Sequence, residues 1–412
     1  MAMIFANKFS SKKQYIILSA VGKLLKSTPE ILLFYFLASE VYSNFSVLYN
    51  QTLIISNWVL FGFGSAGYGF FGQSQSQVRL RAALRFVANN TLLIIAGYYL
   101  LNFVIDIPFS IWSILCGGLL AALAAQSLYL RCTGDLNKSV VNIDITPNLT
   151  MLLIFGTFIL INVDPDVSMI VLFSYLIGFA LSILATSKQN AGSHSECIPT
   201  SSIYRISEPF FALSAINIFL SKIDSTLLQG SVSADSLSQY ILSTRIAALI
   251  LTASYVFQGY YLPGIVSATV NRDRKELKSI LFKYIADTSQ INFIFSLICA
   301  ILANFDTPGF FWNQIDVKTF FITVFLMSFI SPLSVATYIL VRASKTYFSM
   351  AYTIVFGFGS LYFIVNNSTS LQLYSVAGIL YGSILLIKIS ESLTVIYTMR
   401  SWRSKSQNIS VG

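Results

Sequence analysis

The sequence is poor in charged residues, histidine and cysteine. Only 10% of its 412 residues are charged, whereas soluble domains carry about 25%. The hydrophobic fraction is 55% and the aromatic fraction is 15%. A soluble protein of this length cannot bury so much apolar surface. The composition therefore predicts a membrane protein, in which each span takes about 20 apolar residues.

The scarce residues also exclude several kinds of site. The single histidine, His194, lies in a polar stretch, so neither a His-ligated metal centre nor a Ser-His-Asp triad is expected. The four cysteines, Cys116, Cys132, Cys197 and Cys299, have no CxxC spacing, and they predict no disulfide framework. No cofactor and no metal is predicted.

Apolar stretches recur along the whole chain and predict about twelve transmembrane helices. The basic start of the chain is followed by no small-residue cleavage site, so we interpret the first stretch as an uncleaved helix. An even number of spans places both termini on one side of the membrane. The predicted spans are 14–39, 45–71, 83–105, 107–130, 139–163, 166–187, 203–229, 236–262, 280–303, 318–341, 347–366 and 373–399.

The charges of the predicted loops agree with this count. The net charge of +9 does not require a nucleic-acid partner, because cytoplasmic loops of membrane proteins are rich in Lys and Arg. If the N-terminus is cytoplasmic, the outer loops contain a single base, Lys318. The acids in these outer loops are Glu40, Asp106, Asp164, Asp166, Asp235, Asp306 and Asp316. The inner loops then hold Lys8, Lys12, Lys13, Arg79, Arg81, Arg85, Arg131, Lys138, Lys188, Arg205, Arg272, Arg274, Lys275, Lys278, Lys283, Arg342, Lys345, Arg400, Arg403 and Lys405.

The longest inner loop lies at the midpoint of the chain. It predicts an N-terminal six-helix bundle over 1–187, a cytoplasmic linker over 188–202 and a C-terminal six-helix bundle over 203–412. A second inner segment, 269–283, is basic and amphipathic, and we expect it to form a helix lying on the inner surface.

Ionisable residues inside spans are costly and usually face a polar interior. The first span contains Lys23, Lys26 and Glu30 at spacings that place them on one helical face, and Pro29 should kink this helix. Lys26 lies roughly 18 Å from the cytoplasmic end of the span. A Lys26–Glu30 pair with only a structural role is the alternative, but it leaves Lys23 without a partner on this helix.

Further ionisable residues lie in spans of both halves. Arg245 has no acid at i±3 or i±4 on its own helix, which favours a polar cavity. Lys222 and Asp224 lie near an outer end, where they would also suit the interface. Lys388 and Glu391 are i,i+3 partners, which favours a structural pair. The others are Asp144, Glu208 and Asp287, which lie near cytoplasmic ends where solvation is an equal alternative.

The five intramembrane bases predict a shared cationic cavity between the two bundles. Such a cavity suits an anionic cargo, because Arg binds phosphate through its planar fork and Lys as a point charge. The cavity bases are Lys23, Lys26, Lys222, Arg245 and Lys388, and the candidates for coupling or gating are Glu30, Asp144, Glu208 and Asp224.

Polar residues within the spans have two interpretations. They would hydrogen-bond a sugar-like cargo, or they would hold helices together, which we favour for each one individually. Examples are Asn57, Tyr68, Asn89, Asn90, Tyr129, Asn142, Asn217 and Tyr338. The Gly-rich stretch 61–72 has no GKS/T sequence of a nucleotide-binding loop, so we expect it to permit close packing or bending of helices.

Two stretches resemble polysaccharide exporters of the MOP superfamily. In 222–266, Asp224, Tyr240, Arg245 and Pro263 match that family's pattern of an Asp before a short outer loop, then a Tyr, a polar or basic residue and a Pro on span eight. The stretch 35–68 resembles the family's first two spans. In size and span count the chain is most similar to the Wzx-type O-antigen flippases, although MATE drug exporters share the architecture.

The resemblance implies a non-enzymatic flippase of a bacterial inner membrane. Its cargo would be an undecaprenyl-diphosphate-linked oligosaccharide, moved to the periplasmic leaflet by alternating access, beside an O-antigen polymerase and a chain-length regulator. Coupling to protons, another ion or the membrane potential stays open.

Three rival functions remain for comparison. A multidrug or cation antiporter of the same fold would favour an acidic, aromatic cavity. A membrane enzyme would show a large outer loop or a clustered Asp motif, which the sequence does not contain. A structural subunit is disfavoured by the polar residues inside both halves.

Overall fold

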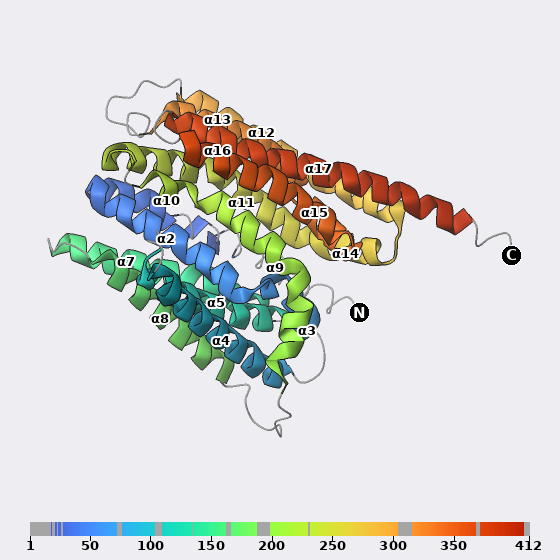
Figure 1. The fold of residues 1–412 in the computed structure, drawn as a ribbon, viewed down its shortest axis with the longest axis horizontal. Coiled ribbons are helices and arrows are strands. Elements are labelled where there is room, and N and C mark those ends of the chain that lie inside the picture. Colours follow the sequence, from blue (N-terminus) through green and yellow to red (C-terminus); the bar gives the residue numbers. More distant parts are fainter. Residues whose placement is uncertain are drawn as a thin grey trace, which may run out of the picture. The chain divides into compact units, whose positions relative to one another are not determined.

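The computed structural model describes the backbone of residues 18, 21–22, 24–25, 28–71, 76–103, 109–133, 135–161, 166–187, 198–229, 231–303, 315–367 and 371–407. Every regular element in these ranges is a helix (Figure 1). After a helical stretch over 28–36, the elements are α2 (Ser39–Leu60), α3 (Phe63–Phe71), α4 (Ser76–Asn102), α5 (Ile111–Cys132), α6 (Leu136–Val140), the π-helix η1 (Val141–Ile145), α7 (Thr146–Leu160), α8 (Val167–Ser187), α9 (Thr200–Lys222), α10 (Asp224–Leu228), α11 (Ala234–Val270), α12 (Arg274–Ala303), α13 (Val317–Leu333), α14 (Ala336–Arg342), α15 (Thr346–Tyr352), the π-helix η3 (Thr353–Phe358), α16 (Gly359–Asn367) and α17 (Leu373–Gln407).

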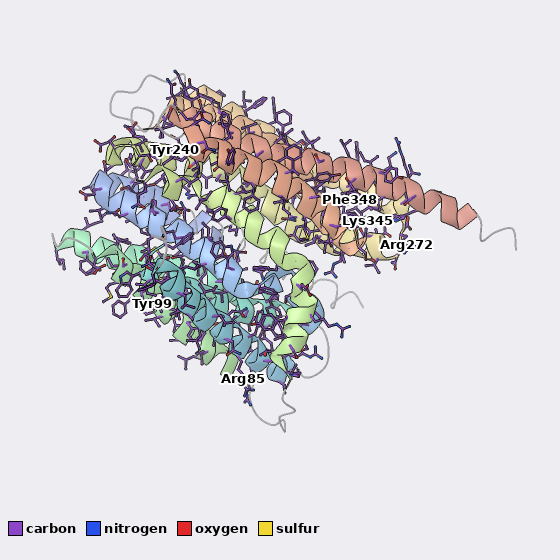
Figure 2. All side chains as sticks on the ribbon, in the orientation of Figure 1. Arg85, Tyr99, Tyr240, Arg272, Lys345 and Phe348 are labelled. Carbon is purple, nitrogen blue, oxygen red and sulfur yellow. The ribbon has the colours of Figure 1, made fainter. Side chains whose placement is uncertain are left out.

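Helices occur in the described parts of the spans predicted from hydropathy, whereas part of the first span, 14–39, lies outside the described residues. Seven helices among the described residues are long and apolar enough to cross a membrane by length and composition alone: Val78–Asn102, Ile111–Cys132, Asn137–Leu160, Val167–Leu184, Val317–Arg342, Thr346–Asn367 and Leu373–Trp402. Many large apolar side chains on their surfaces are exposed, for example Tyr99 on α4 (Figure 2). Such a surface suits contact with hydrocarbon.

The chain forms two compact units, residues 1–229 and residues 230–412. In the first unit α9 packs against α2 and α3, and α10 packs against α2. The division into two six-helix bundles joined by a linker at 188–202 stays a prediction, and residues 188–197 lie outside the described ranges.

Helix α5 is the centre of the first unit, where it packs against α2, α3, α4 and α8. Small residues permit this close approach. A Cβ at Gly117 would lie 2.6 Å from Cγ2 of Ile55 and 3.1 Å from the backbone nitrogen of Ser56. The glycine therefore allows α5 to touch the backbone of α2.

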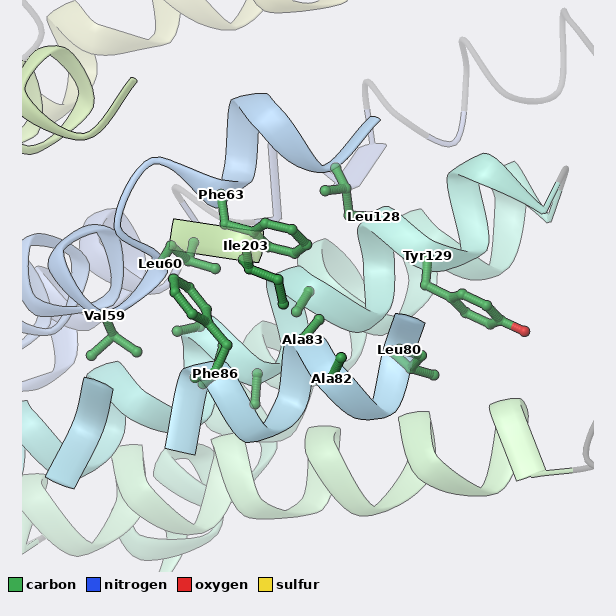
Figure 3. Packing of buried hydrophobic residues seen from close by; sticks show 14 of the residues in the cluster. Val59, Leu60, Phe63, Leu80, Ala82, Ala83, Phe86, Leu128, Tyr129 and Ile203 are labelled. Carbon is green, nitrogen blue, oxygen red and sulfur yellow. The ribbon is translucent and has the colours of Figure 1, made fainter. Parts of the chain in front are cut away.

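Aromatic and aliphatic side chains close the core around α5. Phe63 of α3 and Phe86 of α4 are fully buried, and Ile203 brings α9 into the same cluster (Figure 3). The cluster therefore fixes α9 to α3, α4 and α5 within the first unit.

The Gly-rich stretch 61–72 bends the chain, as the sequence predicted. Phe61 and Gly62 have φ angles of 46° and 77° and separate α2 from α3. Asn90 of α4 donates a 2.8 Å hydrogen bond to the carbonyl of Val59 just before the bend. A side chain of a neighbouring helix therefore pairs with one of the carbonyls that the C-terminal end of α2 leaves without a helical partner.

Helices α11, α13 and α17 form the centre of the second unit, with α12 packed on α11 and α13 and with α14 and α15 packed on α17. Pro332 lies at the end of α13. Proline removes a backbone donor, and the helix breaks after it before α14 resumes at Ala336. A buried cluster ties the α14 side of this break to α11, α12 and α17; its members are Ile265, Ala268, Leu277, Tyr284, Val335, Ala336, Ile339, Leu340 and Val395.

The prediction of a separate surface helix over 269–283 is wrong. Helix α11 continues to Val270, and α12 begins at Arg274 and runs without a break to Ala303. The turn between them contains Arg272 with a φ of 54°. The basic residues therefore lie on the first turns of a long helix, because each helix extends past its apolar section.

Helices α11 and α17 are unusually long, with 37 and 35 residues. At 1.5 Å per residue each is more than about 50 Å long. Both reach the end of the second unit at which Arg272 and Lys345 lie, whereas Tyr240 lies toward the other end (Figure 2).

Candidate functional site

The structure describes three of the five bases predicted to line a cavity. Lys23 and Lys26 lie outside the described residues. Lys222 is half-buried at the end of α9. Arg245 is 5% exposed and Lys388 is 8% exposed. These two side chains are therefore buried within the protein, while the shared cationic cavity and their role in binding cargo stay predictions.

Arg245 lies in a tightly packed part of α11. Its neighbours Ser243 and Thr244 are also buried, and their hydroxyls donate to the carbonyls of Gln239 and Ile241 on the same helix, at 2.7 and 2.9 Å. These two hydroxyls therefore donate within their own helix. A guanidinium cannot lose its proton, so the second unit keeps a permanent positive charge at this point.

The first unit contains buried carboxylates. Glu30, on the helical stretch 28–36, is 3% exposed and interacts electrostatically with Tyr175 of α8, which is hydrogen-bonded to Tyr49 of α2. Asp144 in η1 is 1% exposed. Its side chain is therefore buried, and the alternative of a solvated position at the cytoplasmic end does not hold for it. A Cβ on Gly22 would lie 3.0 Å from the Cβ of Asp144, so the first helical residues pack beside this aspartate.

The π-helix η1 that carries Asp144 follows from local sequence. Pro147 lies in the first turn of α7 and lacks the N–H that a regular helix would bond to a preceding carbonyl. Asn148 also donates from its side chain to the carbonyl of Asp144 at 2.8 Å. Such π-helical turns occur often at functional sites.

Asp224 begins the short helix α10 and is buried rather than at an exposed interface. Its Oδ1 accepts the backbone N–H of Ser225 at 2.8 Å, and the Ser225 Oγ accepts a 2.7 Å hydrogen bond from Asn50 of α2. These contacts fix α10, which follows α9, to α2. Glu208, by contrast, is exposed on α9.

The predicted pair of Lys388 and Glu391 is confirmed. The lysine Nζ lies 2.9 Å from Oε2 of Glu391, and the glutamate is fully buried. Thr337 of α14 donates to the same Oε2 at 2.6 Å and accepts from Nζ at 2.5 Å. Ser349 of α15 donates to Oε1. The sequence did not predict these two hydroxyls, because nothing in its periodicity links α14 or α15 to α17.

Several polar residues join helices, as we favoured. Asn142 of η1 donates to Ser182 of α8 at 3.1 Å. Tyr204 of α9 donates to the side chain of Asn90 on α4. Asp287, which the sequence left between solvation and a site, accepts a 2.5 Å hydrogen bond from Tyr261 of α11.

Comparison with solved structures shows which known fold the chain shares. The fold matches a multidrug-resistance MATE-family transporter of the MOP superfamily in an outward-facing conformation, with a TM-score of 0.66, 13% identity and coverage of 95% of this chain and 97% of that chain. The chain therefore has the twelve-helix, all-α architecture of MATE and MOP transporters.

Two further matches have different cargoes or pockets. The lipid II flippase MurJ, in an inward-closed conformation, gives a TM-score of 0.63 at 14% identity over 94% of this chain and 89% of that chain. A MOP superfamily transporter from Pyrococcus furiosus, for which a reversed polarity of the binding pocket suggests a different function, gives 0.59 at 12% identity over 95% and 96%. No protein-family model and no curated protein sequence matches the chain.

Proposed function

We propose that the chain is a flippase for an undecaprenyl-diphosphate-linked oligosaccharide, the repeat unit of an O-antigen. It moves this cargo from the cytoplasmic to the periplasmic leaflet of a bacterial inner membrane, with both termini in the cytoplasm. The head group passes through a cationic central cavity by alternating access while the polyprenyl tail stays in lipid. No covalent bond is made or broken. An O-antigen polymerase and a chain-length regulator are the proposed partners.

The burial of Arg245 carries this proposal. Moving a diphosphate out of water requires donors that offset its lost hydration. A guanidinium offers a planar fork of N–H groups that matches phosphate oxygens two at a time and stays charged throughout the cycle. Lys222, Lys23 and Lys26 add point charges in the proposal.

Lys388 takes a smaller part in cargo binding than the sequence suggested. Its ammonium is already bonded to Glu391 and Thr337, so the net charge it offers an anion is small. The proposal places most weight on Arg245, because its guanidinium stays charged and presents a planar fork of N–H groups.

The membrane potential supplies a direction for the proposed transport. An inside-negative potential favours outward movement of an anion by about 2.3 kcal/mol per charge per 100 mV. The buried acids Glu30, Asp144 and Asp224 are proposed to bind a coupling proton or cation or to gate the cycle. Glu208, whose side chain is exposed on α9, stays a further candidate for this role.

A MATE-type multidrug or cation antiporter is the second candidate. The buried carboxylates Glu30 and Asp144 of the first unit favour it, since a carboxylate in a membrane interior suits a cationic cargo or a proton. Permanent positive charge at Arg245 opposes it. Proteins of this fold include both a multidrug transporter and a lipid II flippase, so the polarity of the cargo distinguishes the two candidates.

Charge reversal at Arg245 tests the proposal. The wild type, Arg245→Glu and Arg245→Lys are expressed in a strain that lacks its own repeat-unit flippase, with membrane levels of each variant measured. We expect the wild type to restore surface polysaccharide, Arg245→Glu to abolish it, and Arg245→Lys to restore part of it because the bidentate fork is lost. Arg400→Glu, an exposed position on α17, is the matched control and should behave as the wild type.

The same strains separate the two candidates. Normal surface polysaccharide in Arg245→Glu at wild-type protein levels contradicts the cargo role. Failure of the wild type to restore polysaccharide, together with resistance to cationic drugs in an efflux-deficient strain, supports the antiporter instead.

A further inference from the structure

The second unit contains a buried ammonium whose described partners are all oxygen atoms. Nζ of Lys388 lies 2.9 Å from the Oε2 of Glu391 and 2.5 Å from the Thr337 Oγ1. The hydroxyl of Ser349 occupies the other carboxylate oxygen. One carboxylate and one ammonium balance in charge, and hydroxyls from two other helices complete the cluster.

The spacing of Lys388 and Glu391 along α17 explains their contact but not the stability of the whole cluster. A lysine placed before an acid on one helix is the less favourable order, and an exposed i,i+3 pair contributes only about 0.2–0.5 kcal/mol. Here the pair is buried, and breaking a buried pair leaves an uncompensated charge. The stabilising effect of the cluster therefore depends on the helices that its hydrogen bonds join.

The cluster holds three helix segments at a break in the fold. Thr337 lies in the first turn of α14, just after the break that follows Pro332. Ser349 lies on α15, and one turn further along α17 Thr394 is bonded to Tyr352 at 2.9 Å. Thus α14 and α15 are both fixed to α17 through the Lys388 cluster.

We propose that the ammonium of Lys388 is a resident cation, occupying a site that would otherwise take a small monovalent cation from solution. The ligands around it, a carboxylate and hydroxyl oxygens, are those that hard cations use. Because the ammonium is covalently attached, the second unit holds α14 and α15 on α17 without a free ion. This inference is independent of the cargo.

Removal of the ammonium converts the cluster into a site for an added ion. In Lys388→Ala the fully buried Glu391 has no counter-charge, a state that is costly in a low-dielectric interior. A sodium ion has the same charge, and the shortened side chain leaves space for it. The variant therefore gains a dependence on small cations that the wild type does not have.

Thermal unfolding of the purified full-length protein in detergent tests this proposal without any cargo. Each variant is unfolded in NaCl and in N-methyl-glucamine chloride at equal ionic strength. We expect the wild type to unfold at the same temperature in both salts. Lys388→Ala should unfold several degrees lower in N-methyl-glucamine and recover much of this loss in NaCl.

Two further variants make the outcome decisive. Lys388→Ala/Glu391→Gln has no carboxylate charge and should respond equally to both salts. Lys318→Ala, at the start of α13, should match the wild type. An unfolding temperature of Lys388→Ala that does not depend on sodium overturns the proposal, as does a sodium effect that persists with Glu391→Gln. Failure of Lys388→Ala to fold in either salt also overturns it, because no free cation then replaces the ammonium.

Discussion

Replacement of Gly62 by alanine should destabilise the first unit strongly. The residue has a φ of +77°, in the left-handed region that costs other residues about 1–2 kcal/mol. A Cβ there would lie 2.6 Å from the backbone nitrogen of Phe211, 2.6 Å from the carbonyl oxygen of Ser207 and 2.8 Å from the carbonyl carbon of Phe210. These atoms belong to the backbone of α9, which cannot rotate away as a side chain does.

The two effects add because they arise from different causes. Overpacking against a fixed neighbour costs about 1–3 kcal/mol, so Gly62→Ala should lose roughly 2–5 kcal/mol in total. Relief requires α9 to move away from the turn between α2 and α3. We therefore expect weaker transport as well as lower stability.

Thermal unfolding of the detergent-solubilised protein measures this effect. Gly97→Ala is the matched control, because a Cβ at Gly97 of α4 meets no atom within 4 Å and alanine favours a helix. Gly97→Ala should unfold at or above the wild-type temperature, and Gly62→Ala clearly below it. Equal unfolding temperatures for the two variants would refute the argument that α9 is fixed against Gly62.

Two hydrogen-bonded contacts lead to further predictions. Asn50→Leu and Ser225→Ala each remove the 2.7 Å hydrogen bond between α2 and α10, and a double-mutant cycle of unfolding free energies should give a coupling of about 0.5–1.5 kcal/mol; a coupling of zero would show that the bond contributes nothing. Thr337→Val should lose about 1–3 kcal/mol, because the buried Lys388–Glu391 pair then lacks its shared hydroxyl, whereas Thr337→Ser should lose little. Equal losses in the two Thr337 variants would place the effect in packing rather than in hydrogen bonding.

The membrane helices were predictable because hydropathy over about 20 residues is a strong, local signal. The turn in the Gly-rich stretch was also predictable, since Gly62 tolerates a positive φ. The surface helix over 269–283 was wrongly predicted because a basic amphipathic pattern has the same appearance on a helix end that extends beyond the apolar section.

The candidate site was predictable only where partners share one helix. Lys388 and Glu391 are three residues apart on α17, so their contact follows from helical geometry. Thr337 and Ser349 come from helices whose place beside α17 depends on packing, and single hydroxyl residues are common in membrane helices. The sequence predicted that Arg245 faces a polar cavity. The structure shows that Arg245 is buried on α11, and its role in binding a cargo stays a prediction.

The length of α11 and α17 has a practical consequence. A hydrocarbon layer of about 30 Å takes up about 20 residues of a helix, whereas these helices contain 37 and 35. We expect the surplus turns to extend beyond the hydrocarbon at the end of the second unit that contains Arg272, where residues 270–273 are exposed. A spectroscopic label or an antibody epitope on these turns would then report movements of the second unit from outside the bilayer.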